Sequence, residues 1–151
     1  MDVRALVFDV FGTVVDWRSG VAREVRRLLP DRVDPVAVAD DWRRRYSPAM
    51  DRVRRGELPW TPLDALHRAS LDELLAERGL SDVSSAVREE LTLAWHRLDP
   101  WPDAVPGLTR LRSRFVLAPL SNGNVALAIG LARHGRPVSY THLTLPTILR
   151  V

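Results

Sequence analysis

The sequence contains no Cys and no Lys. Without Cys, the chain can form no disulfide, no thiolate nucleophile and no Cys-ligated zinc site. It has no apolar run long enough to span a membrane, and no signal-peptide pattern precedes the strand-like segment that starts at Ala5. These absences favour a soluble cytoplasmic protein.

All of the basic side chains are therefore Arg, and the net charge is +3. Acidic residues are interleaved with Arg along the chain instead of leaving a basic tail, so we expect no nucleic-acid partner. A length of 151 residues with an apolar fraction of 46% is enough for one domain, or for a small core that carries an insertion.

Two short, unbroken apolar runs, residues 5–8 and 115–120, predict strands. Such runs are typical of strands buried on both faces of a parallel sheet. The long segment between them, from 19 to about 98, has apolar residues at helical spacing and Pro- or Gly-rich breaks, which predicts four or five helices. Two further helices are expected over 105–113 and from 124 to about 134. This order of elements predicts an α/β fold.

The first predicted strand ends in Phe8-Asp9-Val10-Phe11-Gly12-Thr13. A carboxylate at that end points into the crevice where α/β proteins bind ligands. Gly12 allows a tight turn, and Thr13 can donate a hydrogen bond that fixes the direction of the carboxylate. Taken alone, the pattern also fits an Asp that only caps a turn.

The second predicted strand ends in Ser121-Asn122-Gly123-Asn124, where a helix begins. Hydroxyl, amide and helix N-terminal N–H groups make a good anion site, although an N-cap turn alone would use the same residues. Because both strand ends would face one crevice, we favour a functional site.

The segment Asp9-Val10-Phe11-Gly12-Thr13 resembles motif I of the haloacid dehalogenase-like superfamily, and Ser121-Asn122-Gly123 resembles its motif II. The resemblance covers residues 1–137. It implies a Rossmann-like α/β core with an incomplete parallel sheet, formed by residues 1–16 and 99–137. It also implies a helical cap, residues 17–98, inserted after the first strand.

Position 11 distinguishes activities within this superfamily. Its phosphatases carry a second Asp two residues after the nucleophile, which acts as a general acid and helps to hold magnesium. Here the residue is Phe11, as in the type II L-2-haloacid dehalogenases, whose halide leaves without protonation. The resemblance implies hydrolysis of short 2-haloalkanoic acids to 2-hydroxy acids through an ester of Asp9, with no metal and no cofactor. A phosphatase of the same superfamily and a non-catalytic fragment are the alternatives.

The resemblance assigns Asp9 as the catalytic nucleophile and a small 2-halocarboxylate as the partner. The implied substrate-binding residues are Phe11, Thr13, Arg43, Ser121 and Asn122. Of these, Arg43, which follows a Trp, and Asn122 are expected to contact the halide, together with Trp60 as a looser match. A solvated basic helix face is the alternative for residues 43–45. The resemblance is also consistent with a homodimer.

The sequence departs from the family in two respects. Family members are longer and supply a motif III Lys and a later acidic loop, whereas this chain contains no Lys. Residues 138–151, beginning Val138-Ser139-Tyr140, resemble a translated sequencing adapter, so we interpret them as a non-native tail on a truncated dehalogenase. A genuine short variant with one more strand at 141–145 is the alternative. We expect weak or no turnover from this chain.

Overall fold

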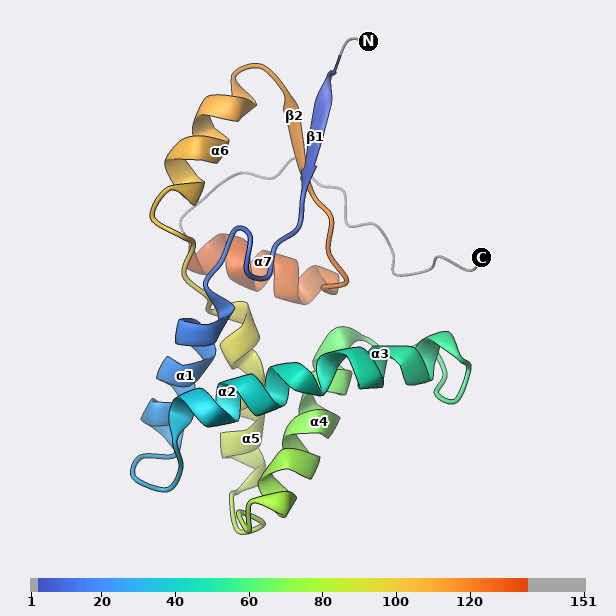
Figure 1. Cartoon of the computed structure of the whole chain (residues 1–151), viewed down its shortest axis with the longest axis vertical. Coiled ribbons are helices and arrows are strands. Elements are labelled where there is room, and N and C mark those ends of the chain that lie inside the picture. The colour runs from blue at the N-terminus through green and yellow to red at the C-terminus, as the bar shows by residue number, and fades with distance from the viewer. Residues whose placement is uncertain (1–2, 136–151) are drawn as a thin grey trace. The chain divides into compact units, whose positions relative to one another are not determined.

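The computed structural model describes residues 3–135 of the chain. These residues divide into two compact units, each described by itself (Figure 1). The strand unit comprises residues 3–17 and 96–135, and the helical unit comprises Arg18–Trp95. The predicted tail at 138–151 lies outside the described residues.

The strand unit is built on two parallel strands, β1 (Ala5–Phe8) and β2 (Val116–Pro119). Their register pairs Ala5 with Val116 and Phe8 with Pro119, and the Leu120 N–H continues the pairing by donating to the Phe8 carbonyl at 2.7 Å. Two helices complete the unit, α6 (Ala104–Arg112) before β2 and α7 (Val125–His134) after it. The carboxyl ends of both strands therefore lie at one edge.

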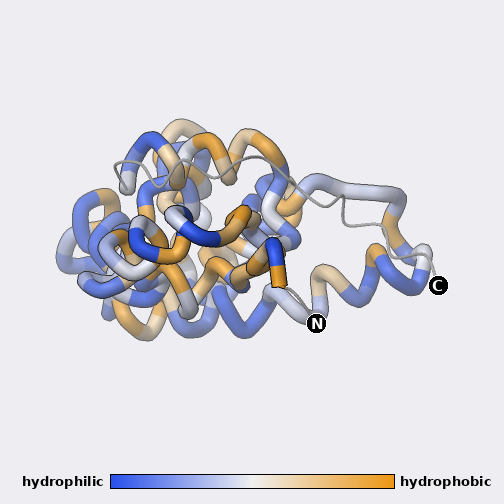
Figure 2. Tube along the Cα trace, turned by 90° about the horizontal axis from the view of Figure 1, so that it is seen from above, coloured by the Kyte–Doolittle hydropathy of each residue, from blue (hydrophilic) through white to orange (hydrophobic). Residues whose placement is uncertain are grey.

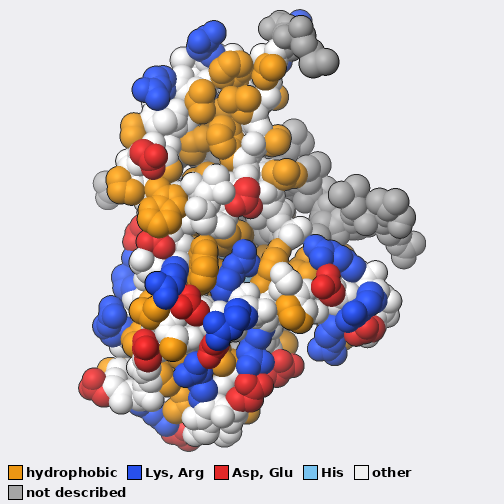
Figure 3. All heavy atoms as spheres, in the orientation of Figure 1, with side chains coloured by type: hydrophobic (Ala, Val, Ile, Leu, Met, Phe, Trp, Pro, Cys, Tyr) orange, Lys and Arg blue, Asp and Glu red, His pale blue; other side chains and the backbone are white. Residues whose placement is uncertain are grey.

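The strands are less buried than their apolar sequences predict. Val7 in β1 is 60% exposed and Val116 in β2 is 55% exposed, whereas Leu117 is 1% exposed. The expectation that β1 is buried on both faces is wrong for the described residues. The sheet described here consists of these two strands, and no other described element buries Val7 or Val116. Apolar side chains gather over the strand unit on the face seen in Figure 3.

The helical unit contains most of α1 (Trp17–Leu28), then α2 (Pro35–Arg44), α3 (Tyr46–Arg54), α4 (Leu63–Glu77) and α5 (Ser85–Thr92), followed by a short 3-10 helix from Leu93. Hydrophilic and hydrophobic residues alternate along the coils of the chain (Figure 2). The buried stripes include Val21, Val25, Leu71, Leu75 and Leu91, each at 0% exposure. Five helices agree with the four or five predicted.

Two buried Trp side chains organise the interior of the helical unit. Trp42 of α2 and Trp95 are each 1% exposed and meet edge to face, with ring centroids 5.5 Å apart. The Trp42 indole N–H donates to the His67 carbonyl of α4 at 3.0 Å, and the His67 ring stacks on Trp95 with centroids 4.5 Å apart. This cluster fixes the rotation of α2 against α4. No helix among residues 3–135 is long and apolar enough to cross a membrane.

Candidate active site

Asp9 directly follows β1, and its exposed side chain is held by the turn that comes after it. The Thr13 hydroxyl donates a hydrogen bond of 2.8 Å to Asp9 Oδ2. The backbone closes the same turn, since the Val14 N–H donates to the Val10 carbonyl at 2.9 Å. Within residues 3–135, no cation forms an ion pair with the Asp9 carboxylate. The carboxylate is therefore both oriented and accessible.

Gly12 allows the turn to close. Its φ angle is 99°, in the region that side chains disfavour, and its N–H donates to the Val15 carbonyl at 3.0 Å. A Cβ atom at this position would also lie 3.6 Å from the Trp17 indole. The requirement for Gly is thus mainly conformational, because that contact is of ordinary van der Waals length.

Phe11 lies half-buried between Asp9 and Gly12. Its ring carries no ionisable group, so it can neither donate nor accept a proton. From Phe8 to Gly12, the only carboxylate that the motif offers is that of Asp9.

Ser121 and Asn122 follow β2 and lie half-buried at the edge where Asp9 follows β1. The Ser121 hydroxyl oxygen accepts the Gly123 N–H at 3.1 Å, which folds the chain toward the start of α7. A Cβ atom on Gly123 would lie 3.0 Å from the Leu127 side chain, so a larger residue here would require that side chain to shift by a few tenths of an ångström. The five predicted site residues of the strand unit, Asp9, Phe11, Thr13, Ser121 and Asn122, therefore follow the ends of two paired strands.

The segment Asp99-Pro100-Trp101 runs along the motif I turn, a contact that the sequence pattern did not predict. The Trp101 N–H donates to the Val14 carbonyl at 2.9 Å, and the Asp16 N–H donates to the Asp99 carbonyl at 2.9 Å. The Trp101 indole Nε1–H also donates to the Gly12 carbonyl at 3.1 Å. The only signal in the sequence is a Trp between two Pro residues where the chain returns from the helical segment.

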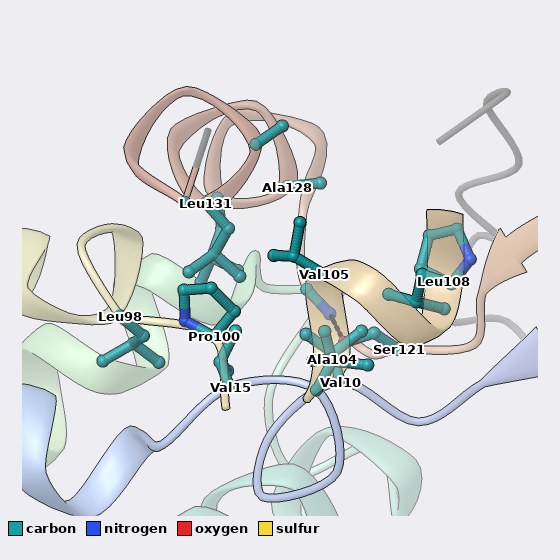
Figure 4. Close-up of a pocket in the computed structure, with 16 residues that line it drawn as sticks. Val10, Val15, Leu98, Pro100, Ala104, Val105, Leu108, Ser121, Ala128 and Leu131 are labelled. Atoms are coloured by element: carbon teal, nitrogen blue, oxygen red, sulfur yellow. Dashed lines mark hydrogen bonds between the residues drawn. The ribbon is translucent and has the colours of Figure 1, made fainter. Parts of the chain in front are cut away.

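A small apolar cavity of about 70 Å³ lies beside the same turn within the strand unit (Figure 4). Its wall includes Val10 and Val15 from the turn, Val105 from α6 and Leu131 from α7, with Ser121 as a polar side chain. Asp9 does not line it. The cavity is partly open and lies beside the turn that follows Asp9, and its volume suits no more than a few non-hydrogen atoms.

The other two predicted site residues, Arg43 and Trp60, belong to the helical unit. Arg43 follows the buried Trp42 on α2, and its guanidinium lies over the Tyr46 ring at 4.5 Å from the centroid, a cation–π contact. Trp60 is 65% exposed in the connection before α4. A role for either residue at Asp9 stays a prediction.

Two carboxyl groups of the helical unit have a pKa that differs from the usual value. The Arg18 guanidinium beside Asp40 holds the pKa of that carboxyl below its usual value, and Arg32 does the same to the pKa of Asp82. Both ion pairs are exposed on the surface of the helical unit. Among residues 3–135, no group of three His, Asp or Glu side chains is placed to hold a metal ion.

Comparison with known families agrees with this arrangement of strand ends. The profile of the haloacid dehalogenase-like hydrolases matches residues 3–142. The chain belongs to this family. The matched residues include the carboxyl ends of both strands. The fold is that of the family.

Three relatives illustrate the similarity. A defluorinating L-2-haloacid dehalogenase of known structure is 46% identical with a TM-score of 0.85, over 89% of this chain and 57% of that one. An L-2-haloacid dehalogenase from Xanthobacter autotrophicus, solved with chloropropionic acid covalently bound, is 27% identical with a TM-score of 0.76, over 88% and 52%. The (S)-2-haloacid dehalogenase 1 of Pseudomonas sp. (strain CBS-3) is 31% identical over 88% of this chain and 57% of its own length. This haloacid dehalogenase-like hydrolase thus spans little more than half the length of these relatives.

Proposed function

We propose that this chain carries the nucleophile and part of the substrate site of an L-2-haloacid dehalogenase. The reaction is the hydrolysis of a short 2-haloalkanoic acid to the 2-hydroxy acid. The observation that carries the proposal is the Asp9 carboxylate, oriented by Thr13 at the end of β1 with Phe11 two residues later. Relatives that are named L-2-haloacid dehalogenases support it.

In the first step, a carboxylate oxygen of Asp9 attacks the halogen-bearing carbon from the side opposite the halide. A C–O bond forms as the carbon–halogen bond breaks, the configuration inverts, and the halide leaves with the bonding electron pair. The Thr13 hydrogen bond limits rotation of the carboxylate and so favours an in-line approach.

In the second step, water attacks the carboxyl carbon of the Asp9 ester. The acyl C–O bond breaks while the alkyl C–O bond is kept, one water proton goes to the oxygen of the departing 2-hydroxy acid, and the other is lost to solvent as Asp9 becomes a carboxylate again. Halide is a stable anion that needs no proton to leave, so Phe11 in place of an acid is compatible with this chemistry. In a phosphatase, by contrast, an alkoxide leaving group would need a proton that Phe11 cannot supply.

Ser121 and Asn122 are proposed to bind the substrate at the same edge as Asp9. Their hydroxyl and amide groups, next to the start of α7, suit a carboxylate or a departing halide. We further propose that the helical unit is the cap of a Rossmann-like core and that Arg43 and Trp60 complete the halide site from it. A partner copy, as in a homodimer, is compatible with this proposal but not required by it.

The absence of Lys limits what this chain is expected to do. The family places a Lys near the nucleophile, and no residue of this chain can supply one. The negative charges of the Asp9 carboxylate and of the substrate would then repel each other without that compensation. We expect slow turnover, and the first chemical step is the one to test.

The test is chloride release from L-2-chloropropionate by the full chain, followed by mass measurement of the protein. We expect released chloride in proportion to a protein adduct whose mass is that of the substrate less hydrogen chloride. Asp9→Asn should abolish both. Asp103→Asn is the matched control, because Asp103 is an exposed carboxylate of the same unit whose side chain makes no capping hydrogen bond to α6.

Three outcomes would reject the proposal. Chloride release that persists in Asp9→Asn would show that another group performs the displacement. Release of phosphate from a phosphomonoester that depends on magnesium and on Asp9, without chloride release, would favour the phosphatase. Absence of both reactions would identify the chain as a non-catalytic member of the family.

A further inference from the structure

The segment 99–101, far away in the sequence, forms hydrogen bonds with the turn that follows Asp9. Two backbone hydrogen bonds of 2.9 Å link Asp16 to Asp99 and Trp101 to Val14. They hold the end of the turn but do not reach its flexible point, which is Gly12. The Trp101 indole, 89 residues along the chain, donates to the Gly12 carbonyl itself.

The Gly12 carbonyl is a sensitive place for such a bond. Gly has the widest backbone freedom of any residue, and here it adopts a φ angle of 99°. The carbonyl belongs to the peptide plane between Gly12 and Thr13, so its direction sets the path of the backbone into Thr13. Thr13 in turn donates to Asp9 Oδ2 at 2.8 Å. The indole N–H thus bonds to the peptide group that directly precedes Thr13, whose hydroxyl aims the carboxylate.

We propose that Trp101 is a positioning residue for the nucleophile, acting through Gly12 and Thr13 on the orientation of Asp9. The inference rests on the proposed function of Asp9. It assigns the effect to the single indole N–H, which donates to the Gly12 carbonyl at 3.1 Å.

Packing in the protein interior does not explain why a Trp stands at position 101. Its side chain is 38% exposed, while Trp42 and Trp95 are almost fully buried. An indole at such a place could equally donate to water, so the bond to Gly12 contributes little net stability and mainly selects one direction for the carbonyl. Removing the N–H should therefore disturb the turn more than the overall stability.

The experiment removes the donor and keeps the ring. In the full chain, Trp101 is replaced by benzothienylalanine, in which sulfur stands in place of the indole N–H, and in a second variant by Phe. Thr109→Val is the control, since it removes another exposed side chain–backbone hydrogen bond, of 2.8 Å, within α6 of the same unit. Far-UV circular dichroism verifies that each variant folds.

Two readouts do not depend on turnover. The first is hydrogen exchange of the Gly12 and Val15 amides, which close the turn. The second is the resonance of the Asp9 side-chain carboxyl carbon at fixed pH, with Thr13→Val as the reference for a lost hydroxyl bond. We expect exchange about fivefold faster in both Trp101 variants, and an Asp9 resonance displaced toward that of Thr13→Val. The control should match the wild type.

Wild-type exchange rates in both Trp101 variants, or an Asp9 resonance that does not move, would overturn the proposal. Chloride release is measured in parallel. In a wild-type chain that releases chloride, the Trp101 variants should lower kcat while leaving KM nearly unchanged, and a change in KM alone would count against positioning. In a chain that releases none, the proposed function fails, and the two spectroscopic readouts still decide whether Trp101 positions Asp9.

Discussion

Thr13→Val tests how much of the reactivity of Asp9 comes from its orientation. Val has nearly the shape of Thr, so the substitution removes the 2.8 Å hydrogen bond to Asp9 Oδ2 and changes little else. A hydrogen bond to a charged group contributes about 1.5–3 kcal/mol when it is protected from water. This one is exposed, and a contribution of about 1 kcal/mol corresponds to a rate about fivefold lower.

The assay is the initial rate of Asp9 adduct formation with L-2-chloropropionate, followed by mass spectrometry of the intact chain. Thr13→Ser is the matched control, because it keeps the hydroxyl and should retain most of the wild-type rate. The unfolding midpoint of both variants in urea should stay close to that of the wild type. A Thr13→Val variant as fast as the wild type would refute the reasoning, and so would a Thr13→Ser variant as slow as Thr13→Val.

Three further predictions concern the folding of the two units. Gly12→Ala should lower the unfolding free energy by about 1–2 kcal/mol, measured in urea, because Ala disfavours the φ angle of 99°; an unchanged stability would contradict the strain argument. Trp42→Phe should destabilise by about 2–3 kcal/mol in the same assay, because it leaves a gap in the core and deprives the His67 carbonyl of its 3.0 Å donor; a neutral effect would show that the cluster repacks freely. Arg32 lowers the pKa of Asp82, so this pair stabilises the fold above the unfolded carboxyl pKa of about 3.9 and ceases to do so as pH falls through the lower folded value. Asp82→Asn should therefore lower the unfolding midpoint slightly at neutral pH and not at all in strong acid, and an equal effect at both would exclude the ion pair as its cause.

The sequence pattern predicted well the ends of those strands and helices that depend on residues nearby in the sequence. The first strand was expected at residues 5–8 and occupies Ala5–Phe8, and the last helix was expected to end near 134 and ends at His134. One of the Pro-containing sites expected to break the helical segment, Ser47-Pro48, lies instead in the first turn of α3, which begins at Tyr46. Pro is tolerated in the first turn of a helix, where its missing N–H has no partner to lose.

Features that depend on distant neighbours were not predictable from the pattern. The burial of Val7 depends on which elements cover the sheet, and an apolar strand sequence does not contain that information. The bond from Trp101 to Gly12 joins residues 89 positions apart, so no periodicity indicates it. The Thr13–Asp9 bond, by contrast, spans one tight turn and follows from the motif itself.

The most direct test of the central claim is a single turnover with L-2-chloropropionate in water labelled with heavy oxygen. The proposed mechanism predicts an adduct on the peptide that contains Asp9, followed by heavy oxygen in the Asp9 carboxylate and not in the first molecule of product. Heavy oxygen in that first product, with none on Asp9 and no adduct, would show that water attacks the substrate directly and would contradict the assignment of Asp9 as the nucleophile.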